Sequence, residues 1–481
     1  MALNPGTNLN ATPATQQQAL PSNYIDFTAN GNGWAQQYLP DLVEKESEVF
    51  GNRTVAGFLE KVGAEEAMAS DQVIWSEQGR LHLSYQCNTT ATANQISIAK
   101  SIDGVAQTTT HGIRLGDTVV VADASATAKC YVSAIDGTNR EKITVLPYGS
   151  ASLAAAGIAA SQTGEACTIF VYGSEFVKGS DGRADANEPG FKSYTNKPII
   201  MKDFYQVSGS DASQIGWVEV SGEEGQNGYL WYLKASGDTR SRFTDYCEMS
   251  MIEAEKIDGG TALATHNANI KGTEGLFAAV EDRGNISFND LSLGEFDTIL
   301  KEFDKQGAIE EYMMFLNRTS ALAVDDMLAG MGNVVNQGAG SSYGVFDNDA
   351  DMALNLGFSG FRRGSYDFYK TDWKYLNDIS TRGGMADLGT GTASSSIGAV
   401  KGMFVPAGVS TVYDQSLGKN LKRPFLHVRY RASGAENRKF KTWTTGSVGA
   451  STSAIDAMEM HYLTERCLIV QGANNFVMMK G

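Results

Sequence analysis

Between residues 85 and 177 the chain alternates short apolar runs with turn signals, and this alternation constrains its fold more than any other feature. The runs are rich in Val, Ile, Tyr and Phe, which favour strands, and they are separated by Gly, Asp and Pro, which favour turns. We therefore predict a small β-domain inserted into the chain at about 85–177. Its clearest strands are expected at 118–123, 130–135, 142–146 and 167–172.

Helical patterns stand on both sides of this insertion. An amphipathic helix is predicted for 52–62, and the longest helical pattern covers 239–257, where apolar residues share one face and a glycine pair follows. Ser292 with Glu295 three residues later forms a capping box that predicts the start of another helix. Asn317 is expected to cap a further helix.

The end of the chain is predicted to be buried, although most soluble chains finish in a polar tail. Two apolar runs, 467–470 and 476–479, flank a Gly-Ala-Asn-Asn turn. Other strands are expected at 197–209, at 308–316 and repeatedly from 397 onward. The order is arm, helix, β insertion, long helix, mixed middle and β end. We therefore expect an α+β fold with an insertion, and not the regular alternation of a doubly wound sheet.

Residues 1–30 are rich in Ala, Thr, Gln and Asn and cannot bury enough apolar surface to fold alone. Such a segment is either a disordered tail or an arm ordered by lying on another molecule. A neighbouring subunit is the natural candidate, and we expect this second arrangement.

Composition excludes several classes of protein. The net charge of -16 over 481 residues disfavours a protein that grips nucleic acid by bulk electrostatics. The five cysteines are scattered and contain no CxxC pair, a pattern that predicts reduced thiols in a cytoplasm and argues against a disulfide framework or a zinc ribbon. We expect no signal peptide, because the first residues lack its basic and apolar segments, and no stretch is apolar for long enough to span a bilayer.

Catalytic motifs are few. The stretch GSSYG matches a serine hydrolase motif with Ser342 as the nucleophile, and Asp347 and His427 follow in the right order. However, the buried strand and the helix that must flank the motif are absent from the pattern. The acidic loop 347–351 begins like an EF-hand, but Met352 stands where glycine is required. We predict no catalytic residue, no cofactor and no metal ligand, and thus a protein that is not an enzyme.

Residues 418–441 are strongly basic in an otherwise acidic chain. The segment is predicted to contact DNA or the acidic surface of neighbouring copies, or else to be a solvated strand face that balances local acids. His427 lies on this strand and is expected on a solvated or interface face. The candidate inter-subunit contacts are Arg423, Arg429, Arg431, Arg438, Lys439 and Lys441.

This order of elements resembles the tailed-bacteriophage major capsid proteins of the Hong Kong 97-type fold. In that family the chain runs from an N-arm through an extended loop and a spine helix to an axial domain, and then returns to the peripheral domain. The closing ERCLIVQ, GANN and FVMMKG are similar to the strand, turn and strand with which members end, and KGMFVPAG and RPFLHVRYRASG are also similar to the family. The resemblance covers nearly the whole chain, as an order of elements.

Carried onto this sequence, the resemblance implies five parts. They are an N-terminal arm and first helix (1–62), an extended loop with the β insertion (63–200), a peripheral domain with the spine helix (201–257), an axial domain (258–440) and returning peripheral strands (441–481).

The resemblance also implies a function. The chain would self-assemble as hexamers and pentamers into an icosahedral shell that encloses double-stranded DNA. Its expected partners are itself, portal, scaffold and decoration proteins, with packaged DNA nearby without specific recognition and with no membrane. It would be located in the virion and assembled in the host cytoplasm. Because Met1 is kept, we expect a separate scaffold. Alternatives are a tail or baseplate component, and a serine hydrolase that uses Ser342.

Overall fold

The computed structural model describes most of the chain from residue 57 to residue 480. Of the predicted helix at 52–62 only 57–59 are described, and Phe58 and Leu59 are helical and buried there. The predicted arm, the Ser342 motif and the acidic loop 347–351 lie outside the described residues. The described residues are 57–59, 64–77, 79, 81–89, 94–107, 111–138, 140–159, 164–183, 186–187, 192–212, 219–221, 227–257, 261–267, 269–288, 292–307, 309–335, 359–386, 400–407, 409–414, 419–448 and 451–480.

The described chain divides into two compact units. The larger one holds Phe58–Ile199, Ser250–Asn437 and the chain from Glu465 onward, and the smaller one includes Ile200–Met249 and Arg438–Thr464. The five-part division expected from the sequence stays a prediction.

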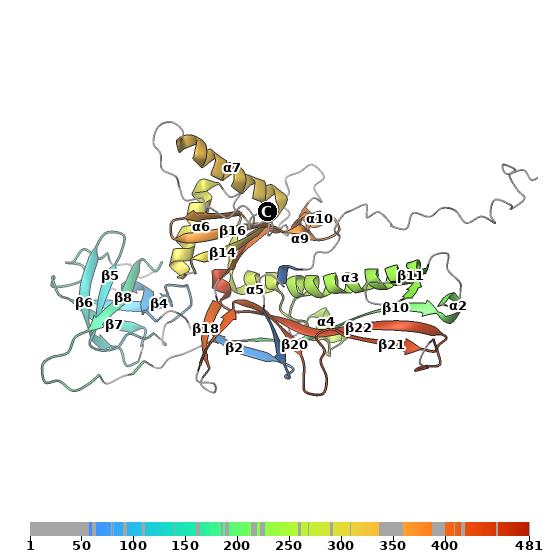
Figure 1. Cartoon of the computed structure of the whole chain (residues 1–481). Helices are drawn as coiled ribbons and strands as arrows, with labels where there is room; N and C mark the ends of the chain where they lie inside the picture. Colours follow the sequence, from blue (N-terminus) through green and yellow to red (C-terminus); the bar gives the residue numbers. More distant parts are fainter. Residues whose placement is uncertain are drawn as a thin grey trace, which may run out of the picture. The chain divides into compact units, whose positions relative to one another are not determined.

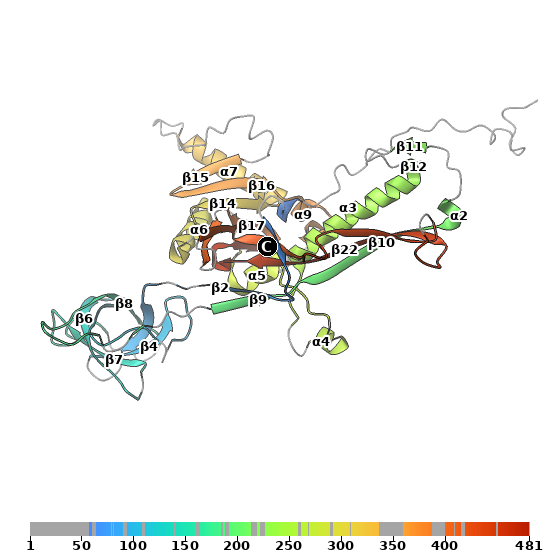
Figure 2. The same cartoon turned by 60° about the horizontal axis from the view of Figure 1, so that its bottom comes forward.

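The β insertion is a closed barrel in the order β3-β4-β7-β6-β5-β8 (Figures 1 and 2). Along its strands buried side chains alternate with exposed ones, because successive residues of a strand point to opposite faces. The inward residues form an apolar core that includes Ile96, Val119 and Val132. The four strands expected from the sequence are confirmed, and β3 and β4 add two more. The barrel strands are β3 (Ser84–Thr89), β4 (Gln95–Ser101), β5 (Asp117–Ala122), β6 (Thr127–Ile135), β7 (Lys142–Pro147) and β8 (Cys167–Ser174).

The barrel is inserted between the two strands of a ribbon. β2 (Val73–Glu77) and β9 (Lys192–Asn196) pair antiparallel as a two-stranded sheet. Trp75 is buried on one face of β2, whereas Ile74 on the other face is 64% exposed. The ribbon therefore has one face in the core and one apolar side chain in solvent.

A five-stranded sheet runs in the order β1-β20-β22-β10, with β21 also paired to β22. β1 is parallel to β20, and β22 is antiparallel to both β20 and β21. The strands predicted at 197–209 and in the basic segment are thereby confirmed. The strands are β1 (Ala64–Met68), β10 (Ile199–Ser208), β20 (Leu426–Arg431), β21 (Lys441–Gly446) and β22 (Ala457–Val470).

The long helix α3 (Leu230–Glu253) begins earlier and ends sooner than the sequence predicts. Its first turns contain Gly237, which favours a turn locally but costs only about 1 kcal/mol inside a helix. Phe243 and Cys247 are buried against Tyr462, as the apolar spacing predicts. Tyr246, expected on the same face, is instead 50% exposed, so the apolar stripe is narrower than predicted.

A six-stranded sheet carries the second large core, in the order β13-β23-β17-β14-β16-β15. Helices α5 (Leu276–Arg283), α6 (Leu293–Gln306) and α7 (Arg318–Val335) belong to the same unit (Figure 1). The capping box of Ser292 is present at α6, and the Asn317 side chain accepts a hydrogen bond from the Ser320 amide at the start of α7. The strands are β13 (Asn285–Ser287), β14 (Glu311–Leu316), β15 (Ser359–Arg363), β16 (Tyr366–Asp372), β17 (Val400–Pro406) and β23 (Val477–Lys480).

The two faces of β14 belong to two clusters of aromatic residues. Tyr312 stacks on Phe303 of α6, with 4.3 Å between ring centroids. Phe315 lies on the opposite face, where Phe58 meets it edge-on at 4.6 Å and stacks on Trp373 at 4.4 Å. The residues that follow the predicted arm are therefore fixed in the core of the larger unit.

The end of the chain is buried, as predicted. Residues 467–470 are buried in β22, and β23 lies between β13 and β17 inside the six-stranded sheet. A short 3-10 turn, η2 (Ala473–Asn475), joins them. The remaining elements are α2 (Gly209–Ala212), β11 (Glu219–Ser221), β12 (Asn227–Tyr229), α4 (Ala262–His266), α9 (Lys374–Asn377), α10 (Arg382–Ala386), β18 (Val409–Asp414) and β19 (Lys419–Pro424).

Candidate interaction surfaces

Arg429 and Arg431 lie on the same side of β20, but their charges are balanced within the chain. Arg429 forms an ion pair of 2.7 Å with Glu66, the residue directly opposite on the parallel strand β1. Arg431 forms an ion pair of 2.7 Å with Glu465 and a second one with Asp71. These carboxylates, Asp71 first, raise the pKa of Arg431. Neither arginine needs another subunit to neutralise it.

His427, on the same strand, is buried. The expectation of a solvated or interface face is wrong for this residue, because its side chain is only 2% exposed. β20 is a central strand, and His427 has Ala64 of β1 on one side and Ile469 of β22 on the other. The alternation of residues along a strand predicts which ones share a face, but it does not tell which face is covered.

The other basic candidates belong to other parts of the chain. The side chain of Arg423 lies outside the described residues, although its backbone is part of β19. Arg438, Lys439 and Lys441 belong to the smaller unit, whereas Arg429 belongs to the larger one. The backbone carbonyl of Lys439 accepts a 2.6 Å hydrogen bond from Thr464, and the Lys441 ammonium lies 5.7 Å from the centre of the Trp443 ring. An inter-subunit role for these residues remains a prediction.

A second candidate surface lies on the outside of the barrel. Outward-facing positions of β7 and β8 carry large side chains in solvent, and Tyr148 follows β7 directly. The exposed residues are Leu146, Tyr148, Phe170 and Tyr172. Of these residues, Tyr148 and Tyr172 share one face, and exposed aromatic residues are typical of binding surfaces because the rings offer area for contact at a small loss of conformational freedom.

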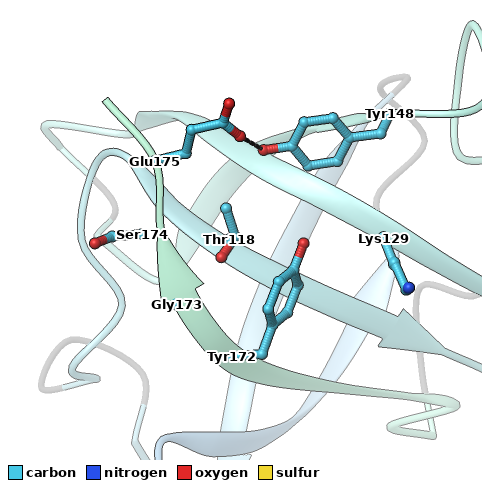
Figure 3. Close-up of a pocket in the computed structure, with 7 residues that line it drawn as sticks. All are labelled: Thr118, Lys129, Tyr148, Tyr172, Gly173, Ser174 and Glu175. Carbon is cyan, nitrogen blue, oxygen red and sulfur yellow. Dashed lines mark hydrogen bonds between the residues drawn. The ribbon is translucent and has the colours of Figure 1, made fainter. Parts of the chain in front are cut away.

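A shallow hollow of about 580 Å³ opens on this face. Figure 3 shows Tyr148 and Glu175 joined by a hydrogen bond, with Tyr172, Thr118 and Lys129 beside them. The phenol of Tyr148 donates to the Glu175 carboxylate, and this bond raises the pKa of Tyr148 to about 12. Tyr148 therefore stays a neutral donor at physiological pH.

Gly173 lines this hollow next to Thr118. A Cβ atom at this position would stand 3.2 Å from the hydroxyl oxygen of Thr118. The hollow offers aromatic faces, hydroxyl groups, one carboxylate and one ammonium. This set can bind a partner through contact and hydrogen bonds, but it contains no nucleophile paired with a histidine base.

A polar hollow of about 840 Å³ lies in the larger unit where α7 begins, and three of its polar residues bind one another. Arg318 forms an ion pair with Asp372, and Asn377 donates a 2.7 Å hydrogen bond to the same carboxylate. The Asn377 side chain in turn accepts a 2.7 Å bond from the Arg318 amide. The hollow is thus a structural cap for α7.

Within the described part of the chain, no three His, Cys, Asp or Glu side chains gather closely enough to hold a metal ion. None of the described helices is both long and apolar enough to cross a membrane.

Two sites were missed by sequence reasoning. Asn196, at the end of β9, is fully buried and binds two other segments of the larger unit. Cys87 and Cys167 meet in the barrel core. A single Asn before Lys-Pro and two cysteines far apart in the sequence carry no local signal for either site.

Comparison with known proteins gives distant likenesses. No protein-family model matches the chain, and no curated protein matches it. Among the solved structures that match, several cover nearly all of the chain. Three of them are the capsid of the cyanophage P-SCSP1u (9% identity, TM-score 0.39, 96% of this chain and 99% of that chain), Microbacterium phage Oxtober96 (7%, 0.39, 95% and 99%) and the capsid of a native GTA particle (9%, 0.40, 94% and 99%). With TM-scores below 0.5, these likenesses establish neither the fold nor the function of this chain.

Proposed function

We propose that this chain is a major capsid protein of a tailed bacteriophage, with a Hong Kong 97-type fold. The observation that carries the proposal is the order of elements along the chain. A ribbon with a barrel inserted in it is followed by a long helix and a six-stranded sheet. The chain then comes back in β22, which pairs with β10 and β20. This order agrees with the family that the sequence resembles.

In this proposal each element has a place in the capsid subunit. The ribbon β2–β9 is the extended loop and the barrel is its insertion. The helix α3 is the spine helix and, with β10, β21 and β22, belongs to the peripheral domain. The six-stranded sheet is the axial domain. The sequence-based division assigned all of 441–481 to the returning peripheral strands. We propose to keep β22 there and to assign β23 to the axial domain, because it pairs with β13 and β17.

The ribbon supports a role in assembly. Its inner face packs in the core of the larger unit through Val73 and Trp75. β2 and β9 pair only with each other among the described strands, and Ile74 is exposed on the outer face. We infer that a neighbouring copy covers this face in a hexamer or pentamer, as an extended loop would require.

The acidic net charge agrees better with a protein shell around DNA than with a protein that binds DNA through its charge. A net charge of -16 gives no basic footprint for phosphate groups. We propose that the shell encloses double-stranded DNA without specific contacts, and that scaffold, portal and decoration proteins take part in its assembly. The chain would be assembled in the host cytoplasm and located in the virion. We propose no catalytic role.

The two alternatives differ in what they predict. A tail or baseplate protein would give tubes or plates. The hydrolase on Ser342 would need His427 as its base, yet this histidine is buried in a central strand.

The proposal is tested by the exposed residue of the ribbon. The chain is expressed with and without its scaffold, separated on a density gradient, and examined by negative-stain electron microscopy. The parent and an Ile74→Leu variant should form closed shells, whereas Ile74→Asp should remain as soluble subunits with unchanged circular dichroism. Normal shells from Ile74→Asp would show that the ribbon is not part of the assembly contact. Absence of shells from the parent, even with its scaffold, would contradict the capsid function.

A further inference from the structure

Two of the cysteines meet inside the barrel. Cys87 in β3 and Cys167 in β8 are directly opposite each other in an antiparallel pair. Their Sγ atoms lie 2.6 Å apart, although 80 positions separate the residues in sequence. Both side chains are buried. β3 is the first strand of the barrel and β8 the last, and they are neighbours in the closed order.

The backbone at this pair meets the geometric requirement for a disulfide. Directly opposed residues of antiparallel strands have Cα atoms about 4.5–5.5 Å apart. Disulfides occur at Cα separations of roughly 4.4–6.8 Å. A bond between these two residues therefore requires no movement of the strands.

Cys130 and Cys467 have no cysteine opposite them on their neighbouring strands. Cys130 faces Val119 and Pro147 on its neighbouring strands, and Cys467 faces Arg429. Burial raises the pKa of the Cys130 thiol to about 11 and that of Cys467 to about 12. By contrast, the hydrogen bond with Cys87 lowers the pKa of Cys167.

We propose that Cys87 and Cys167 form a disulfide in an oxidising environment, and that this bond closes the barrel between its first and last strands. The oxidant is a small-molecule disulfide of the glutathione class. The Cys167 thiolate attacks one sulfur of oxidised glutathione, forms a mixed disulfide and releases one glutathione thiolate. The Cys87 thiol then loses its proton and attacks the Cys167 sulfur, which releases the second glutathione. Two protein thiols and one disulfide thus give one protein disulfide and two glutathione thiols.

Burial limits the access of glutathione to the two sulfur atoms. The exchange therefore takes place during folding or when the start of β8 opens. The expectation of five reduced, unconnected thiols therefore changes for two of them. This inference does not depend on the proposed capsid function, because it concerns only the barrel.

The test uses the full chain. It is unfolded, refolded in oxidised or in reduced glutathione, denatured again in an alkylating reagent, and measured by intact mass spectrometry. Of the five cysteines, all five should be alkylated after reduction and three after oxidation. Trypsin cuts after Lys and Arg, so Cys87 falls in peptide 81–100, Cys130 in 130–140 and Cys167 in 143–178. The oxidised sample should contain 81–100 linked to 143–178.

A matched control separates this pair from buried cysteines in general. Cys130→Ala removes a barrel cysteine and should keep the linked peptide, whereas Cys87→Ser and Cys167→Ser should abolish it. The oxidised parent should also unfold at a temperature higher by more than about 10 °C in its barrel transition, because the bond closes a long loop. Five alkylated thiols in the oxidised parent, or a link that includes Cys130, would overturn the proposal. Peptide mapping of the parent decides the question even where a variant fails to fold.

Discussion

Asn196 ties three segments of the larger unit together, and its loss should have a large effect on stability. Its amide nitrogen donates to the carbonyls of Leu468 at 2.6 Å and of Glu274 at 3.0 Å. Its oxygen accepts from the Glu274 amide at 2.9 Å, from the Thr273 hydroxyl at 3.1 Å and from the Lys197 amide at 2.8 Å. The side chain is completely buried. Asn196→Leu keeps the volume of this side chain and removes every one of these bonds.

The magnitude follows from the groups that remain. A buried donor or acceptor left without a partner costs about 1–3 kcal/mol. The carbonyl of Leu468 and the hydroxyl of Thr273, both in fully buried residues, lose Asn196 inside the protein, whereas the backbone groups of Glu274 and Lys197, in partly exposed residues, can turn to water. We therefore expect Asn196→Leu to lower the free energy of unfolding by about 4 kcal/mol. Urea denaturation followed by tryptophan fluorescence measures this value, because Trp75 is buried in the adjacent strand β2.

Asn269 supplies the control. It is exposed in the loop after α4, and Asn269→Leu should change the free energy of unfolding by less than about 0.5 kcal/mol. A loss below about 1 kcal/mol for Asn196→Leu would refute the reasoning, since it would mean that the four bonds to residues 273, 274 and 468 do not hold these segments together.

Four further predictions test other parts of the account. Tyr312→Phe should raise the free energy of unfolding by about 1 kcal/mol, because the phenol is buried without a hydrogen-bond partner among the described residues. Burial also raises the pKa of Tyr312, so the folded state holds this proton more tightly than the unfolded chain does. In thermal melts over a pH series, the stability advantage of Tyr312→Phe over the parent should therefore increase as the pH rises above 10. Ser292→Ala should cost about 1 kcal/mol by removing the cap of α6, with Ser292→Asp as the control that retains it. Arg431→Met should cost about 2 kcal/mol in urea denaturation by leaving the Glu465 carboxylate buried, and adding Glu465→Gln should recover most of the loss. Deleting 1–30 should leave the melting temperature of isolated subunits nearly unchanged while assembled particles fail to close, and unfolding of the subunit would show that the arm packs on its own body.

Local sequence patterns predicted the elements whose signals lie within a few residues. The barrel strands, the capping box of Ser292 and the cap at Asn317 all depend on neighbours three or four positions away or on alternation along one strand. The start of α3 was predicted too late because Gly237 resembles a turn signal, and packing of the rest of the helix outweighs that local preference. Local rules therefore predicted which elements exist better than where they begin.

The candidate surfaces depend on pairings between distant parts of the chain, and these could not be predicted. The charge of Arg429 is balanced by Glu66 only because β1 lies parallel to β20. His427 is buried on a central strand whose two neighbours, β1 and β22, are both distant in sequence. Cys87 meets Cys167 only because the barrel closes. The sequence shows the basic residues of this segment but not the acidic residues that pair with Arg429 and Arg431 in the fold. An interface role was expected for this reason.

The central claim is that this chain forms the shell of a virion, and a cryo-electron microscopy reconstruction of assembled particles tests it most directly. The account predicts an icosahedral lattice of five- and six-fold clusters in which each copy fits the barrel, α3 and the six-stranded sheet. The ribbon β2–β9 should lie against a neighbouring copy with Ile74 in the contact. Tubes, or a shell whose density cannot accommodate these elements, would contradict it.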